Sequence, residues 1–161
     1  MMIATLLLIA GLSYGRGADR APADVADEKT AINETLDKFD EALLAQDVSG
    51  LTSLLCEEGM VIGTDPSEFW NKQEITDLWT EALVQGPPEF KYLGDREIVI
   101  APGGKAAVVV TQYMIPAWSP NIPWRQVYHM VKMKKEWKIL VINIAFVPKN
   151  EHIQAINAAL D

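Results

Sequence analysis

The spacing of apolar positions predicts helices in the first half of the chain. Ile32, Leu36, Phe39 and Leu43 recur at intervals that place them on one face of a helix over residues 25–46. Asn71 and Glu74 have the spacing of a capping box and predict a second long helix, which Gly-Pro-Pro at 86–88 ends. The inward positions of that helix are expected to be Ile75, Leu78, Trp79, Ala82 and Leu83. Between the two helices we expect a short helix capped by Asp47 and a short strand at 60–63.

The second half of the chain has the pattern of strands. Residues rich in β-branched and aromatic side chains occur in five segments, at 90–93, 96–101, 106–115, 124–133 and 137–146. A Pro-rich loop with two tryptophans is expected at 116–123, and a short terminal helix capped by Asn150 is expected to turn Ile153, Ile156 and Leu160 inward. Helices followed by strands predict an α+β domain in which N-terminal helices pack on a curved antiparallel sheet.

The start of the chain has the pattern of a secretory signal. Residues 3–12 are an apolar run that is too short to span a bilayer. Ser13 and Gly15, or Gly15 and Gly17, then place small residues at the −3 and −1 positions of a cleavage site. An apolar tail that is not removed is the alternative, because no Lys or Arg precedes the run. We therefore expect a signal peptide at 1–17, a flexible lead-in at 18–26, a folded domain at 27–161, and a secreted or periplasmic protein without a stable membrane anchor.

Composition and charge exclude several classes of function. The chain has 161 residues, 49% of them hydrophobic, and a formal net charge of −8, which argues against nucleic acid as a partner. The charge is divided: residues 1–97 hold 19 acidic and 7 basic groups, whereas residues 98–161 hold 3 and 7. The single cysteine, Cys56, excludes an internal disulfide. The two histidines, His129 and His152, lack metal-ligand spacing, so no metal and no cofactor is expected.

Several local strings resemble the nuclear transport factor 2-like superfamily, which includes ketosteroid isomerases and SnoaL-like cyclases. They are Ile62-Gly63-Thr64-Asp65 with Glu68 and Trp70, then Trp79, Trp124-Arg125 and Trp137-Lys138-Ile139. The resemblance covers residues 27–148 and implies a cone-shaped α+β barrel, a pocket between the helices and the concave face of the sheet, and a homodimer through the sheet. SnoaL-like relatives often carry a His and a Ser in the last strand, whereas 141–146 hold neither. No catalytic residue is therefore transferred from the resemblance.

Three residues are candidates for acid–base chemistry. Asp65 follows a strand near the expected mouth of the pocket, where burial would raise its pKa and make it a general base. His129 is a second candidate base, and Tyr113 could donate its hydroxyl to an oxyanion. Each has a structural alternative. Asp65 could bond the backbone of its own turn, and His129 and Tyr113 could pack in a core or an interface.

Five further residues are candidates for ligand binding. Strand alternation places Arg125 and His129 on one face of their strand, and Asn143 on the same face as Trp137 and Ile139. Arg125 could bind a ligand carboxylate or pair with an acidic residue of the N-terminal half. The remaining candidates are tryptophans: Trp70 and Trp79 as pocket wall or core, and Trp118, together with Trp124, as a lid or an interface patch.

Three functions follow from these candidates. The first is binding of a small hydrophobic or carboxylate-bearing molecule in an apolar pocket. The second is cofactor-free acid–base catalysis of the isomerase, cyclase or dehydratase type. The third is a protein–protein interaction module that uses the sheet and the tryptophan loop. A carboxylate or imidazole that faces the pocket with a perturbed pKa would favour the second. A cavity of suitable volume would favour the first.

Overall fold

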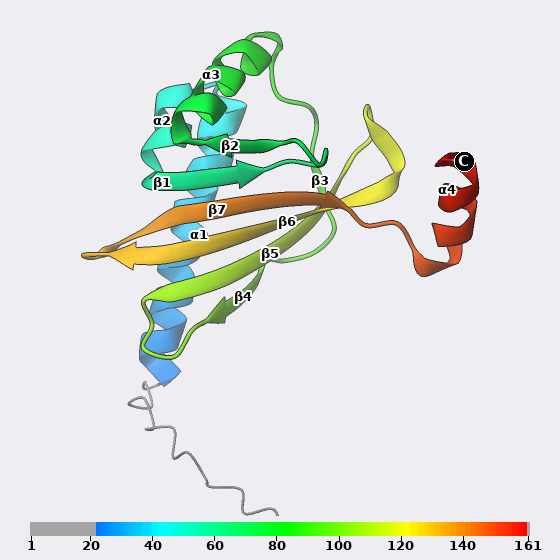
Figure 1. The fold of residues 1–161 in the computed structure, drawn as a ribbon. Helices are drawn as coiled ribbons and strands as arrows, with labels where there is room; N and C mark the ends of the chain where they lie inside the picture. The colour runs from blue at the N-terminus through cyan, green and yellow to red at the C-terminus, as the bar shows by residue number, and fades with distance from the viewer. Residues whose placement is uncertain (1–21, 161) are drawn as a thin grey trace, which may run out of the picture.

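The fold is an α+β domain built on one mixed sheet (Figure 1). A computed structural model describes residues 22–160, so the expected signal peptide at 1–17 lies outside the described residues. The helices are α1 (Pro22–Leu44), α2 (Val48–Ser53), α3 (Lys72–Ala82) and α4 (Ile153–Leu160), with single 3-10 turns at Leu83–Gln85 and Asn150–His152. The strands are β1 (Leu55–Ile62), β2 (Phe69–Asn71), β3 (Lys91–Tyr92), β4 (Glu97–Ile100), β5 (Ala106–Ile115), β6 (Ser119–Met133) and β7 (Glu136–Phe146).

Two of the helices, α2 and α3, begin at the capping residues predicted from the sequence. Asp47 is the N-cap of α2, and its carboxylate accepts a hydrogen bond from the Gly50 N–H at 2.8 Å. Asn71 and Glu74 form the capping box of α3. The first helix begins earlier than predicted, because residues 22–26, expected to be part of the lead-in, already belong to α1.

The sheet differs from the expected one in one pairing and in closure. Its strand order is β2-β1-β7-β6-β5-β3, with β4 also paired to β5. All pairs are antiparallel except β1 with β7, which is parallel, so the predicted α+β fold with a curved sheet is confirmed and the sheet is antiparallel apart from this pair. The sheet stays open and curved, and α1 crosses one of its faces while α2 and α3 lie beside the β1–β2 end (Figure 1).

A β-bulge in β7 changes which of its side chains point to each face of the sheet. Met130 pairs with Ile139 and His129 pairs with Val141, so Leu140 has no partner opposite it on β6. Because of this extra residue, Trp137 and Ile139 share the inner face with Ile142, while Val141 and Asn143 turn to the open face. The prediction that Asn143 shares a face with Trp137 is therefore wrong.

The main core lies between the helices and the inner face of the sheet. Its largest fully buried side chains are Ile32, Leu36, Leu51, Ile75, Met130, Ile139 and Ile142. A buried ion pair fastens the start of α1 to the far end of the sheet: Glu28 accepts hydrogen bonds from the Lys132 ammonium and, at 2.8 Å, from the Trp137 indole N–H. A smaller buried cluster of Tyr113, Ile115 and Trp124 lies at the other end of the long strands.

The terminal helix is not packed as the sequence predicted. No residue of α4 is buried, and Ile153 and Leu160, expected to point inward, are 41% and 81% exposed. The helix stands apart from the sheet at the end of the chain (Figure 1). Asn150 does not cap it either, because the N-cap position of the preceding 3-10 turn is Lys149. The apolar spacing of α4 therefore reflects a helix whose apolar side faces outward in the isolated chain.

Candidate functional site

An apolar cavity of about 230 Å³ lies between α1, α3 and the inner face of the sheet. Both buried clusters contribute to its wall, so the cavity lies where the main core meets the smaller aromatic cluster. The apolar and aromatic lining residues are Phe39, Leu43, Val61, Trp70, Ile75, Leu78, Trp79, Ala82, Leu83, Pro88, Phe90, Tyr92, Tyr113, Ile115, Trp118, Trp124, Tyr128, Ile142 and Ile144. Asp40 and Gln126 complete the wall.

Asp40 is the carboxylate of this wall, and two donors converge on one of its oxygens. The Tyr92 hydroxyl donates to Oδ2 of Asp40 at 3.0 Å, and Nη2 of Arg96 donates to the same atom at 2.8 Å. Burial raises the pKa of Asp40, and the negative charge of Asp37 adds to this; the bonds from Tyr92 and Arg96 act in the opposite direction without cancelling the shift. The cavity thus contains a carboxyl group that is harder to ionise than one in water.

Arg96 joins this carboxylate to a second one on the outer side of α1. Its Nη1 donates to Oδ1 of Asp37 at 2.6 Å, while Nη2 donates to Oδ2 of Asp40. Asp37 is about one helical turn before Asp40, so one guanidinium bridges two side chains of the same helix. Asp37 and Arg96 line a separate, open cleft with Asn33 rather than the cavity. Only Asp40 of this group reaches the cavity wall.

Neutral hydroxyl and amide groups line another part of the wall. The Tyr113 hydroxyl donates to Oε1 of Gln126 at 3.0 Å, and both residues are buried. Burial raises the pKa values of Tyr92, Tyr113 and Tyr128, so these phenols stay protonated at any physiological pH. The indole N–H of the buried Trp124 has no acceptor among residues 22–160. The wall is therefore aromatic, with hydrogen-bonding groups at a few positions.

Comparison with known proteins identifies the family. The family model of the SnoaL-like domain matches residues 32–148. The chain belongs to the SnoaL-like domain family. This confirms the predicted resemblance to the nuclear transport factor 2-like superfamily. No protein of curated function matches the sequence.

Solved structures share the fold of this SnoaL-like domain. An NTF2-like protein of unknown function from Shewanella baltica is 19% identical with a TM-score of 0.59, over 77% of this chain and 97% of the other. A cystatin-like fold protein from Burkholderia xenovorans is 18% identical with a TM-score of 0.62, over 76% and 94%. A domain of unknown function from Nostoc punctiforme is 15% identical with a TM-score of 0.65, over 82% and 85%. At these identities the likeness shows the fold alone.

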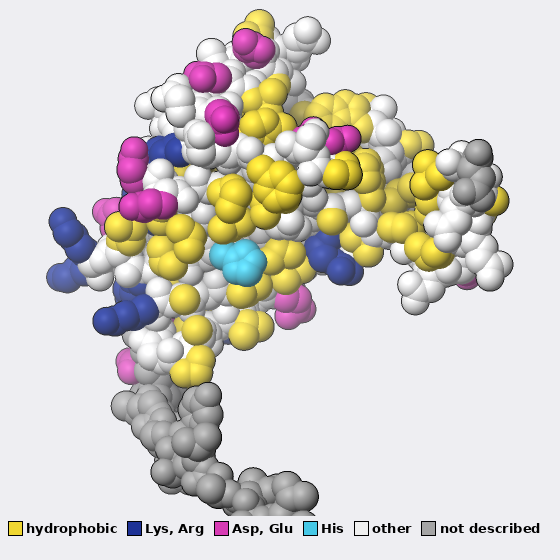
Figure 2. Space-filling model, in the orientation of Figure 1, with side chains coloured by type: hydrophobic (Ala, Val, Ile, Leu, Met, Phe, Trp, Pro, Cys, Tyr) yellow, Lys and Arg dark blue, Asp and Glu magenta, His cyan; other side chains and the backbone are white. Residues whose placement is uncertain are grey.

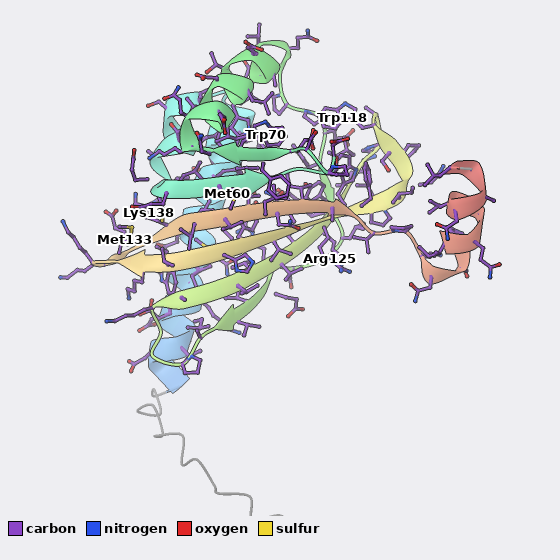
Figure 3. All side chains as sticks on the ribbon, in the orientation of Figure 1. Met60, Trp70, Trp118, Arg125, Met133 and Lys138 are labelled. Atoms are coloured by element: carbon purple, nitrogen blue, oxygen red, sulfur yellow. The ribbon has the colours of Figure 1, made fainter. Side chains whose placement is uncertain are left out.

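Four of the predicted site residues line the cavity of the SnoaL-like domain. Trp70, Trp79 and Tyr113 belong to its wall, and Trp118, which is 64% exposed, lies at its rim (Figure 3). Trp118 lies 6.1 Å from Trp124, ring centroid to ring centroid, and Trp124 stacks on Tyr113. The expected loop at 116–123 is shorter than predicted, because β6 already begins at Ser119.

The other four predicted residues lie outside the cavity of the SnoaL-like domain. Arg125 and His129 are exposed on the open face of β6, and Asn143 is on the same face because of the bulge in β7. Asp65 lies in an exposed turn, where its Oδ1 accepts hydrogen bonds from the N–H and hydroxyl of Ser67. These bonds lower the pKa of Asp65, which agrees with the alternative of a turn aspartate and not with a general base of raised pKa.

Asp40 is a cavity residue that was not among the candidates predicted from the sequence. Its position was a usable signal, because it follows Leu36 by four residues and precedes Leu43 by three, which places it on the apolar face of α1.

Within the part of the chain that the structure describes, no cluster of three or more His, Cys, Asp or Glu side chains could hold a metal ion. None of the described helices is long and apolar enough to cross a membrane.

Proposed function

We propose that the SnoaL-like domain binds a small, mainly apolar molecule in the cavity between α1, α3 and the sheet. The cavity itself carries the proposal, because about 230 Å³ of space is bounded by aromatic and aliphatic side chains with few polar groups. An apolar cavity of about 150 Å³ holds one benzene ring, so this one suits a ligand of about nine or ten heavy atoms. A compact bicyclic molecule is the expected size.

Burying the ligand's apolar surface would supply most of the affinity. The wall contains Leu83, Ile75 and Ile142, which are almost fully buried, and Trp118 at the rim could close over an occupant. The unpaired indole N–H of Trp124 is a further reason to expect an occupant or a small shift of the ring, because a buried donor without an acceptor is destabilising.

Thermal unfolding with 2-indanol, a neutral bicyclic probe, tests the proposal. At about 100 times its Kd the probe should stabilise the protein by about 2.7 kcal/mol. The variant Ala82→Phe should fill part of the cavity and lose this stabilisation, since Ala82 lines it. Ala158→Phe makes the same change on the exposed α4 and should behave like the wild type. Equal stabilisation of the wild type and Ala82→Phe would contradict the proposal.

Acid–base catalysis is the second candidate function, and Asp40 is the observation that favours it. A carboxylate with a raised pKa in an apolar cavity suits a general base, and the nearby Tyr92 hydroxyl suits a donor to a developing oxyanion. Deuterium exchange at the carbons next to the carbonyl of 2-indanone, followed by NMR in D2O, tests this. The exchange should be faster with the wild type than with Asp40→Asn. Equal rates would remove Asp40 as a base.

A homodimer through the open face of the sheet is part of the proposal. Cross-strand pairing aligns Val99, Val108, His129, Val141 and Met60 in one row across five strands. Hydrophobic side chains gather over this face (Figure 2), and Val99 and Met60 are 69% and 37% exposed. An exposed apolar row of this kind favours association with a second copy.

Export from the cytoplasm is also part of the proposal, supported by the apolar run at 3–12. Expression of the whole chain in a bacterium, followed by N-terminal sequencing of protein from the periplasm and medium, tests it. The expected N-terminus lies at residue 16 or 18. Recovery of protein that still begins at Met1, in the cytoplasm alone, would contradict export.

A further inference from the structure

The wall of the cavity carries one negative group and no positive group. Among the described residues that line it, Asp40 is the only Asp or Glu, and none is Lys, Arg or His. The three tyrosines of the wall stay neutral because burial raises their pKa values. An anionic ligand would therefore meet a carboxylate and find no partner of opposite charge within the cavity.

Arg96 does not supply that partner. Its Nη1 donates to Asp37 at 2.6 Å and to the Asn33 carbonyl at 3.3 Å, and its Nη2 donates to Asp40 at 2.8 Å. The guanidinium is thus shared between two carboxylates, and with both ionised the group of Asp37, Asp40 and Arg96 keeps one net negative charge. The expectation of a carboxylate-bearing ligand depended on Arg125, which lies on the open face of the sheet.

One oxygen of Asp40 remains available. Tyr92 and Arg96 both donate to Oδ2, whereas no hydrogen bond from residues 22–160 reaches Oδ1. An ionised carboxylate can accept about four hydrogen bonds, so this group has unused capacity. Its partial burial makes a further donor, and a positive one above all, energetically favourable.

Aromatic rings line the same cavity as this carboxylate. Tyr92 bonds Asp40 directly and lies 6.0 Å from Tyr113, ring centroid to ring centroid. Phe39 precedes Asp40 on α1 and lies 6.0 Å from Tyr128. All four residues line the cavity. The faces of such rings attract cations, so a positive ligand group near Asp40 would be stabilised by the rings as well as by the carboxylate.

We propose that the ligand is a protonated amine with a compact apolar body. Its ammonium group donates a hydrogen bond to Oδ1 of Asp40 among the rings of Tyr92 and Tyr113, and its body fills the apolar part of the cavity. This inference rests on the proposed function, since it names the class of molecule that the same cavity takes.

Three probes that share one bicyclic body test the amine in the wild-type protein. They are 2-aminoindane, which is protonated at neutral pH, 2-indanol, which is neutral, and indane-2-carboxylate, which is anionic. Titration calorimetry should give an affinity for the amine at least about tenfold higher than for the alcohol, or about 1.4 kcal/mol. The carboxylate should bind most weakly. Equal affinity for the amine and the alcohol would overturn the inference.

Two substitutions of the same chemical kind locate the effect. Asp40→Asn should reduce the preference for the amine over the alcohol to less than about threefold and leave the affinity for 2-indanol nearly unchanged. Asp37→Asn is the matched control, because Asp37 contacts the same guanidinium but does not line the cavity, and it should keep the preference. Loss of the preference in both variants, or in neither, would contradict the role of Asp40.

The outcomes separate this inference from the proposed function. If 2-indanol and 2-aminoindane bind equally well and Ala82→Phe abolishes both, the cavity binds ligands but does not select amines. If neither probe binds the wild type, the proposed function fails as well. If 2-aminoindane binds Ala82→Phe as tightly as the wild type, the amine is held by the acidic surface of the protein, and the inference is wrong. A poorly folded Asp40→Asn variant does not affect the wild-type comparison.

Discussion

Asp40 and Asp65 are carboxylates whose environments shift their pKa values in opposite directions. Burial raises the pKa of Asp40 above its ordinary value of 3.8, against the effects of Tyr92 and Arg96. Hydrogen bonds from Ser67 lower the pKa of the fully exposed Asp65. The two groups therefore make opposite contributions to the pH dependence of the free energy of unfolding.

We predict opposite pH slopes for the variants Asp40→Asn and Asp65→Asn. Between the ordinary pKa of 3.8 and the raised pKa of folded Asp40, the folded protein holds a proton that the unfolded chain has released, so the stability of the wild type relative to Asp40→Asn should fall as pH rises through this range. Below about pH 4 the unfolded chain binds a proton at Asp65 while the folded protein keeps this carboxylate ionised. The stability of the wild type relative to Asp65→Asn should therefore fall as pH falls. Urea unfolding of both variants across this range measures the slopes. Slopes of the same sign would contradict the assignments.

The loss of Glu28, a buried carboxylate, should cost more stability than the loss of the exposed carboxylate Glu57. Glu28→Gln keeps the shape of the side chain but leaves the Lys132 ammonium without a charged partner, and should destabilise the protein by about 1–2 kcal/mol in urea unfolding. Glu57→Gln is the control, because Glu57 is 87% exposed and pairs with Lys72 at 3.3 Å; its effect should stay below about 0.5 kcal/mol. Equal effects would show that the Glu28 contacts add little.

Sequence spacing predicted individual residues well where one local interaction decides their environment. The capping pair Asn71 and Glu74 was predicted correctly because both partners lie within one helical turn. Asp40 was missed because its environment depends on Tyr92 and Arg96, more than fifty residues away. Local spacing placed it on the apolar face of α1, but only the tertiary contacts explain why a carboxylate is kept there.

Among the elements, α4 should contribute little to the stability of the isolated domain. Ending the chain after Lys149 removes a helix with no buried residue and should change the free energy of unfolding by less than about 0.5 kcal/mol. Ending it after Ala145 also removes Phe146, whose ring lies 4.4 Å from that of Trp124, centroid to centroid, and should cost more than about 2 kcal/mol. Urea unfolding of both shortened chains checks this. A large loss of unfolding free energy in the chain that ends after Lys149 would mean that α4 packs on the rest of the domain in solution.

The strands were predicted more reliably than their ends and faces. The bounds of β5, 106–115, were predicted correctly from β-branched residues and the glycine turn before it. Pro120 and Pro123 predict a loop over the first five residues of β6, yet proline lacks only the N–H donor and the segment is a strand. Its carbonyl still pairs, since the Val147 N–H donates to the Pro123 oxygen at 2.8 Å.

At the scale of the whole molecule, the two faces of the sheet are expected to have different roles. The inner face carries the core and the cavity, whereas the open face carries the apolar row centred on His129. Two basic residues of the sheet half, Arg125 and Lys138, lie on this open side (Figure 3).

We predict that His129→Glu converts a dimer into a monomer. The substitution places a carboxylate at the centre of the apolar row, where a second copy would bury it against its own counterpart. His152→Glu is the matched control, because His152 is exposed in the 3-10 turn outside the sheet. Light scattering after size-exclusion chromatography, at high micromolar concentration, measures both. A monomeric wild type, or a His129→Glu variant that stays dimeric, would contradict the open face as the interface.

The bulge at Leu140 makes the composition of the cavity wall depend on which residues of β7 pair with β6. Ile139 and Val141 already face opposite sides, as direct neighbours in a regular strand would, so deleting Leu140 should leave every other side chain on its present face. If Leu140 instead entered the ladder, Asn143 would turn into the cavity and Ile142 out of it. β7 can therefore lose Leu140 without changing the cavity wall, whereas bringing one more residue into its ladder would exchange which of its side chains face the cavity.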